Sequence, residues 1–151
     1  MPRVRRLYMY TMDEAQYLNQ FGLVPNPSDL ATIRELLVRE WQAESQQQGS
    51  GNTELMKLFC VQLFSRGELQ DVMLIWRAKN ASMDASCSID IQLLCGAGLG
   101  ATKEYLEGLT DQTAAKALRY LRECEAAGDF EGFSPGDWMK SFRDYYYSDA
   151  E

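Results

Sequence analysis

The sequence predicts an all-α protein of about seven helices, built either as an irregular stack of helical hairpins or as a compact helical bundle. Apolar residues recur every three to four positions through most of the chain, which is the spacing of one helix face. Glycine and proline interrupt these segments where helices are expected to begin or end. No stretch alternates convincingly with a period of two residues, and only Arg3–Tyr10 is compatible with a short strand. The length of 151 residues suits a single domain, 1–151.

The first two helices are expected on either side of a proline turn. Residues 12–21 carry an apolar stripe that ends at Gly22. Pro25 and Pro27 then fix the backbone, and Ser28 is expected to cap the next helix. That helix is predicted to run to about Gln46, because four apolar residues follow at helical spacing: Leu30, Ile33, Leu37 and Trp41.

The segment 45–52 is predicted to be a flexible, exposed loop inside the single domain. Its glutamine, serine and glycine composition is typical of linkers. The residues before it are too few for an independent core, so we do not expect a domain boundary there.

The most buried helix is expected to begin at Asn52 or Thr53 and to end at Gly67. Its apolar residues surround it almost completely: Leu55, Met56, Leu58, Phe59, Cys60, Val61, Leu63 and Phe64. The next helix is marked by a second apolar set: Leu69, Val72, Met73 and Trp76. This helix carries Arg77 and Lys79 in its last turn, where cations interact favourably with the helix dipole.

Further helices are predicted in the second half of the chain. One covers about Ala85–Cys95, with Asp84 as its expected cap. The glycine-rich run 96–100 then leads into helices whose apolar residues are Tyr105, Leu106, Leu109, Ala114, Ala117, Leu118 and Leu121. The last helix is predicted to begin at Ser134–Asp137, with proline in its first turn, and its apolar residues are Trp138, Met139 and Phe142.

Glycines that are expected to end helices recur at a nearly constant spacing. Gly67, Gly98 and Gly128 are 31 and 30 residues apart, and apolar residues lie four and seven positions before each of them. Such a period is typical of stacked helical hairpins. The segment Gln92–Gly98 resembles the helix end of an ankyrin repeat, which implies a HEAT- or ankyrin-like α-solenoid. The Thr-Pro-Leu-His signature of ankyrin repeats is absent, so a non-repetitive bundle is the alternative.

Charge and composition exclude several classes of function. The net charge of −7 argues against a nucleic-acid-binding protein and against a reader of anionic membranes. The absence of histidine excludes Ser-His-Asp and Cys-His catalysis and histidine-bound zinc. No segment has the roughly 20 apolar residues of a membrane span. No apolar run follows the arginines near the N-terminus, so a signal peptide is not expected. We therefore expect a cytoplasmic location.

The cysteines are expected to be reduced rather than catalytic or metal-binding. Cys60, Cys87, Cys95 and Cys124 form no CxxC pair. All but Cys87 lie in apolar helical stretches, where a free thiol acts as a small hydrophobic group.

Three weaker patterns in the sequence bear on possible chemistry. Asp84 and Asp90 lie in an apolar region, and a buried carboxylate pair could perform acid–base catalysis, although a cap or an ion pair with Arg77 or Lys79 is the commoner role. The acids of 123–131 have no EF-hand order, so no metal and no cofactor are expected. The run 96–100 follows no strand, which favours a helix–helix turn over a phosphate-binding loop.

The C-terminal region combines most of the net negative charge with aromatic side chains. Residues 123–151 carry eight acids against Lys140 and Arg143. Acids steer a basic partner towards a surface, and aromatic residues dominate interface energies. The predicted partner-binding residues are Asp129, Glu131, Asp137, Trp138, Asp144, Tyr145 and Tyr146. The alternative is a terminal helix packed on the core, although three consecutive tyrosines on a helix require at least one to be exposed.

Small, acidic, helical chains of this kind resemble the immunity proteins of bacterial toxin systems. The resemblance implies a non-catalytic protein that binds and neutralises a basic toxin domain, without nucleic acid or membrane as partner. The alternative is a helical-repeat adaptor that holds a partner on a concave face between Arg66 and Glu107, with contacts at Arg77, Lys79 and Glu104. A carboxylate enzyme is the third possibility. The oligomeric state stays open.

Overall fold

The computed structural model describes residues 13–147, and this part of the chain is all-α, as predicted. It contains eight α-helices and no strand. The α-helices are α2 (Glu14–Phe21), α3 (Leu30–Gln46), α4 (Thr53–Arg66), α5 (Val72–Lys79), α6 (Met83–Ser88), α7 (Leu99–Glu107), α8 (Gln112–Ala126) and α9 (Pro135–Tyr147). Three short 3-10 helices connect them: η1 (Pro27–Asp29), η2 (Leu69–Asp71) and η3 (Ile91–Cys95). The strand considered at Arg3–Tyr10 lies outside the described residues.

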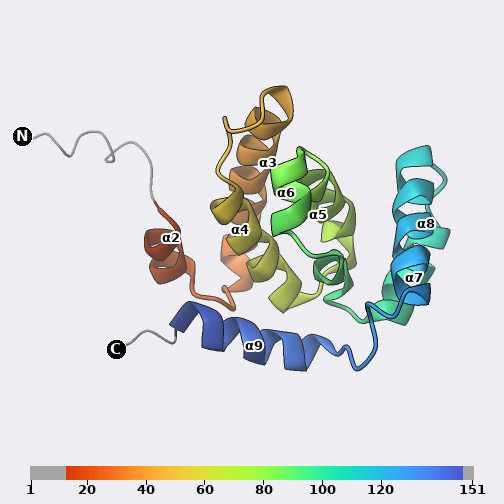
Figure 1. The fold of residues 1–151 in the computed structure, drawn as a ribbon. Coiled ribbons are helices and arrows are strands. Elements are labelled where there is room, and N and C mark those ends of the chain that lie inside the picture. Colours follow the sequence, from red (N-terminus) through yellow and green to blue (C-terminus); the bar gives the residue numbers. More distant parts are fainter. Residues whose placement is uncertain (1–12, 148–151) are drawn as a thin grey trace, which may run out of the picture.

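Helix α4 forms the centre of the molecule (Figure 1). It packs against α2, α3, α6, α9 and η3. Helices α7 and α8 form a hairpin at one end, and α9 runs from that end beneath the body towards α2 (Figure 1). The path of α9 therefore brings the last described residues next to the first ones.

The expected burial of α4 is confirmed on nearly all sides, because nine of its residues between Leu55 and Phe64 are buried. Asn52 caps its start by accepting a hydrogen bond from the Leu55 amide. Gly67 ends the helix in a left-handed conformation. At this end, a Cβ on Gly67 would lie 2.8 Å from the Gly96 carbonyl oxygen, so only glycine permits the contact between the two turns.

The predicted helix over Ala85–Cys95 is wrong, because this segment divides into α6 and η3 at an extended Ile89. The buried Lys79 ammonium donates hydrogen bonds to the carbonyl oxygens of Ser86 and Ile89, at 2.8 and 2.6 Å. The Ser86 carbonyl would accept the next intrahelical bond in a continuous helix, so the lysine replaces that bond. The cap is also different from the prediction: Ser82, rather than Asp84, accepts from the Ala85 amide.

Serine caps were predicted at Ser28 and Ser134, and the one at Ser134 is confirmed. Ser28 lies inside η1, and no side-chain cap is present at α3, so that prediction is wrong. The proline before it draws the chain into a 3-10 turn that leads directly into the helix. Ser134 does accept a hydrogen bond from the Asp137 amide at the start of α9.

The three spaced glycines do not mark equivalent repeats, because Gly67 ends α4 with a ψ of 31°, whereas Gly98 precedes α7 with a ψ of 154°. Gly67, Gly98 and Gly128 all have positive φ angles, of 62°, 100° and 95°. The element before Gly98 is the five-residue η3 rather than a buried α-helix, and a loop follows Gly128 before α9 begins. The arrangement is therefore irregular, as an all-helical stack or bundle allows.

The exposed loop after α3 donates hydrogen bonds to the buried Glu44 carboxylate, which the composition of the loop did not predict. The Glu44 carboxylate, 1% exposed, accepts from the amides of Gly49 and Gly51, both at 3.0 Å, and from the Ser82 hydroxyl at 2.6 Å. These bonds join the loop to the start of α6. The flexibility expected for segment 45–52 stays a prediction.

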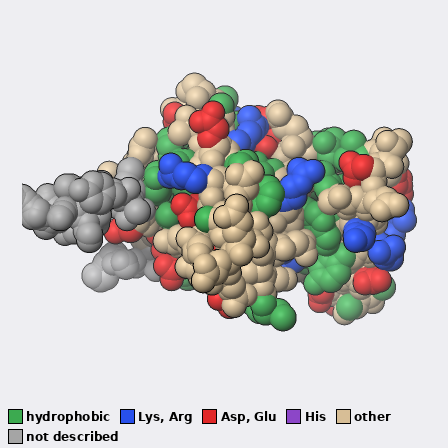
Figure 2. All heavy atoms as spheres, turned by 90° about the horizontal axis from the view of Figure 1, so that it is seen from above, with side chains coloured by type: hydrophobic (Ala, Val, Ile, Leu, Met, Phe, Trp, Pro, Cys, Tyr) green, Lys and Arg blue, Asp and Glu red, His purple; other side chains and the backbone are tan. Residues whose placement is uncertain are grey.

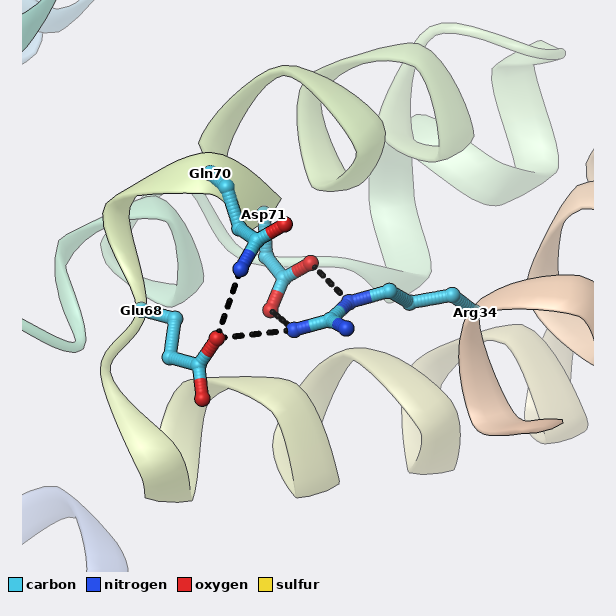
Figure 3. A network of polar contacts seen from close by, with 4 residues as sticks. All are labelled: Arg34, Glu68, Gln70 and Asp71. Atoms are coloured by element: carbon cyan, nitrogen blue, oxygen red, sulfur yellow. Dashed lines mark hydrogen bonds and ion pairs between the residues drawn. The ribbon is translucent and has the colours of Figure 1, made fainter. Parts of the chain in front are cut away.

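A charged network joins α3 to the connection between α4 and α5 (Figure 3). The Arg34 guanidinium donates to both carboxylate oxygens of the buried Asp71, at 2.7 and 3.1 Å, and to Glu68 at 2.9 Å. Gln70 donates to the same oxygen of Glu68. This bidentate geometry is the strong form of an arginine–carboxylate pair, and it holds η2 against α3.

Candidate functional site

Helix α9 carries five of the seven predicted partner-binding residues. Its buried side is formed by Met139 and Phe142. Asp137 and Asp144 are seven positions apart, so they share one side of the helix, and both are exposed. Tyr145 lies between the two sides and is 65% exposed.

The aromatic residues of the region mainly attach α9 to the core. Ring contacts connect Phe130 to Phe133 (5.3 Å between centroids), Phe133 to Trp138 (5.7 Å) and Trp138 to Phe142 (5.8 Å). Phe142 also contacts Phe64 of α4 at 6.3 Å. Trp138 is partly buried in this chain of rings, so its first role is packing.

The predicted residues do not form one continuous patch. Asp129 and Glu131 are exposed, but they lie in the connection between α8 and α9. Helix α9 has 13 residues and is about 20 Å long, so this pair is far from Tyr145. Within α9 the two aspartates are balanced by Lys140 and Arg143. Of the predicted acids, Asp137 and Asp144 are the ones that share a surface with Tyr145.

The three consecutive tyrosines have different environments, and the prediction that at least one is exposed is confirmed. Tyr145 and Tyr147 are exposed, whereas Tyr146 is partly buried against the core. The Tyr147 hydroxyl accepts a hydrogen bond from the Leu23 amide at 3.1 Å. This bond fixes the end of α9 to the segment that follows α2.

A cleft of about 330 Å³ lies between α2 and α9. Its lining residues are Glu14, Ala15, Leu18, Tyr145 and Tyr146. The α2 side of this cleft was not predicted from the sequence. The sequence contains the Asp13–Gln16 capping box that begins α2, but a capping box carries no information about which distant helix lies beside it.

Glu14 supplies the negative charge in the lining of the cleft. Burial raises the pKa of the Glu14 carboxyl, the Glu54 and Asp13 carboxylates raise it further, and Lys57 opposes them. The Lys57 ammonium lies 5.5 Å from the centroid of the Tyr145 ring and 6.0 Å from that of Phe142. This distance from Tyr145 is within the range of a cation–π interaction.

The Tyr146 hydroxyl is buried and has no hydrogen-bond partner in the described part of the chain. Burial raises its pKa, and Glu14 contributes to the same shift. The hydroxyl therefore remains protonated at neutral pH, and Tyr146 offers the cleft a ring rather than a charge.

A second surface lies on α8, at the end of the molecule opposite to α2 (Figure 1). A groove of about 520 Å³ is lined by Ala115, Leu118, Arg119, Arg122, Glu123 and Ala126. Figure 2, which views the face away from α9, shows hydrophobic side chains between the central helices and the α7–α8 end, with charges of both signs around them.

The structure changes the residues available to the adaptor hypothesis. Arg77 and Glu104 are exposed, as that hypothesis requires. Lys79 is buried and bonded to two carbonyl oxygens, so its predicted role as a surface contact is wrong. Its long stem lets a residue of the last turn of α5 reach inward rather than outward.

The weaker chemical patterns gain no support. Asp84 and Asp90 are both exposed, which contradicts a deep pocket that holds both carboxylates. Among residues 13–147, no group of three or more histidine, cysteine or acidic residues could hold a metal ion. Cys60, Cys95 and Cys124 are buried free thiols, whereas Cys87 is exposed. Burial raises the pKa of Cys60, and that of Cys95 to about 12, so these thiols are poor nucleophiles.

Comparison with protein-family models, with curated proteins and with solved structures finds no match to this chain. Among the described helices, none has both the length and the apolar character needed to cross a membrane.

Proposed function

We propose that this chain is a cytoplasmic, non-catalytic binding protein, an immunity protein that neutralises a basic toxin domain. The observation that carries the proposal is the outer side of α9. Asp137, Asp144 and Tyr145 are exposed there, and neither aspartate belongs to an ion pair in the described part of the chain. The two aspartate side chains make no hydrogen bond or ion pair within the described part of the chain, so they are free to contact a partner.

The chemistry of this surface suits a basic protein partner. Exposed carboxylates increase the rate of association with a positively charged surface and make the complex sensitive to salt. Tyr145 offers a large ring with few rotatable bonds, which is typical of residues that dominate binding energy. Because Lys140 and Arg143 balance the two aspartates within α9, Asp129 and Glu131, which precede the helix, add net negative charge to the region.

The proposal is tested by capture of the partner and by a growth assay. The full chain is used to isolate its partner from native cells, and the partner is then expressed alone and together with the chain. We expect a basic partner that inhibits growth alone and is harmless in the presence of the chain. Its affinity is expected to fall as salt concentration rises.

Charge reversal locates the surface. The double variant Asp137→Lys/Asp144→Lys is expected to weaken the complex at least about tenfold and to abolish protection, because like charges across an interface repel. The control is Glu35→Lys, which reverses one exposed acid on a different helix, α3. A partner that binds both variants with unchanged affinity would contradict the proposed surface, and an enzyme activity of the purified chain would contradict the proposed class.

The α8 groove favours the adaptor as the second candidate. Its apolar floor of Ala115, Leu118 and Ala126 is suited to the side of a partner helix. In that case Ala126→Glu would abolish capture, whereas the Asp137→Lys/Asp144→Lys variant would bind normally.

A further inference from the structure

The cleft between α2 and α9 has the size and the walls of a site for a single side chain. Its volume of about 330 Å³ is at the lower end of the range of roughly 300–1,000 Å³ found for small-molecule sites. Two elements distant in sequence form it, and the Tyr147–Leu23 hydrogen bond fixes them relative to each other. The cleft is therefore defined by the tertiary fold.

Two tyrosine rings meet at a right angle in this cleft. The rings of Tyr145 and Tyr146 are 4.9 Å apart, with planes inclined at 85°. Aromatic faces attract cations, and the Lys57 ammonium already lies near Tyr145. Because Tyr145 is exposed, part of its surface is available to a second cation.

The charges around the cleft also favour a cation. Asp13, Glu14 and Glu54 act on this position, and Lys57 opposes them. Glu14 lines the cleft directly and is partly buried, so a cation beside it would stabilise its charged form. Ala15 and Leu18 supply apolar surface for the aliphatic part of a long side chain.

We propose that this cleft receives an arginine side chain of the basic partner, with the guanidinium stacked on the exposed Tyr145 ring and hydrogen-bonded to Glu14. This inference rests on the proposed function for the identity of the partner. Arginine is favoured over lysine because its planar guanidinium stacks on a ring while donating two hydrogen bonds to a carboxylate. The cleft would thus supply the specific contact, while the net negative charge of residues 123–151 supplies long-range attraction.

The test needs no knowledge of the partner. The full chain, labelled with ¹⁵N, is titrated with the blocked peptide acetyl-Gly-Arg-Gly-amide, and amide shifts are followed by NMR. Three matched peptides carry lysine, citrulline or leucine in place of arginine. We expect saturable shifts at residues 14–18 and 145–146 with the arginine peptide, weaker binding of the lysine peptide, and little binding of the two uncharged peptides.

Two variants test the roles of the walls. Glu14→Gln keeps the shape of the side chain and removes the charge, and it is expected to weaken arginine binding by about fivefold, the upper range for a partly exposed ion pair. Tyr145→Leu removes a ring and is expected to weaken binding to a similar degree. The control Glu35→Gln should bind as the unmodified chain does. Unchanged NMR spectra outside the cleft establish that each variant is folded.

The outcomes separate this inference from the proposed function. Equal binding of the arginine and citrulline peptides, tighter binding of the leucine peptide, or no shifts at all would overturn the cationic cleft. In that case the proposed function would still be supported if charge reversal on α9 abolished capture of the partner. Specific arginine binding without any basic partner in cells would support the cleft and overturn the immunity function.

Discussion

Buried charges in this molecule act by holding backbone segments, and Glu44 is the clearest case. Its carboxylate accepts one hydroxyl and two amide hydrogen bonds, and these connect α3, the loop 47–52 and α6. The loop backbone can approach Glu44 this closely because residue 51 is a glycine. A Cβ on Gly51 would lie 2.8 Å from the Glu44 Cβ.

We expect Glu44→Ala to lower the free energy of unfolding by about 2–4 kcal/mol, because it removes the buried acceptor shared by three partly buried hydrogen bonds. Urea unfolding measures this change. Glu35→Ala, at an exposed position of the same helix, is the control and should change stability by less than about 0.5 kcal/mol. Equal effects of the two substitutions would show that the buried acceptor has no special role.

The same side chain predicts a pH dependence. The Ser82 hydrogen bond lowers the pKa of Glu44 below its ordinary value, the loop amides add to this, and burial opposes it. A lowered folded-state pKa gives stability that is complete above the unfolded-state pKa of about 4.5 and is lost as the pH falls through the folded value. Urea unfolding between pH 7 and pH 3 should therefore show a steeper loss for the unmodified chain than for Glu44→Gln. Parallel curves would contradict the assignment.

At the scale of elements, the contact between the end of α4 and the end of η3 depends on two glycines. A Cβ on Gly96 would lie 2.4 Å from the Phe64 carbonyl oxygen, and one on Gly67 would lie 2.8 Å from the Gly96 carbonyl oxygen. The φ of Gly96 is −61°, which any residue adopts. Its requirement for glycine is therefore one of space between two backbones.

This contact gives a prediction with a built-in control. Gly96→Ala should lower the free energy of unfolding by about 2–4 kcal/mol, because backbone atoms must separate to admit the methyl group. Gly100→Ala, in the first turns of α7, meets nothing within 4 Å and should raise stability by up to about 1 kcal/mol. Thermal unfolding compares the two, and a similar loss of stability for both would contradict the steric explanation.

Apolar periodicity and glycine predicted the helices whose bounds are set by the local sequence. They did not predict features that depend on contacts between residues distant in sequence. The burial of α4 and the end of α8 near Gly128 follow from apolar spacing and glycine. The division at Ile89 follows from hydrogen bonds of Lys79, ten residues earlier, and no local pattern reports it. The cleft could not be predicted either, because Glu14 and Tyr145 are far apart in the sequence and lie together only in the folded chain.

At the scale of the whole molecule, α9 has two sides with separate roles. Its inner side, through Phe142 and its neighbouring rings, contacts α4 and connects the α7–α8 end to α2 (Figure 1). Its outer side carries the exposed aspartates, and the exposed Tyr145 lies between the two sides. Because the same helix holds the molecule together and presents the proposed surface, variants on its two sides should have different effects.

We therefore expect Phe142→Ala and Tyr145→Ala to separate stability from binding. Phe142 is buried against Phe64, so its truncation should lower the free energy of unfolding by about 3–5 kcal/mol and increase hydrogen exchange along α9. Tyr145 is 65% exposed, so its truncation should change stability by less than about 1 kcal/mol while weakening partner capture at least about tenfold. Urea unfolding, hydrogen exchange and capture of the partner measure the three quantities. If Tyr145→Ala destabilised the fold as strongly as Phe142→Ala and left capture intact, α9 would be a purely structural helix and the binding surface would have to be sought on α8.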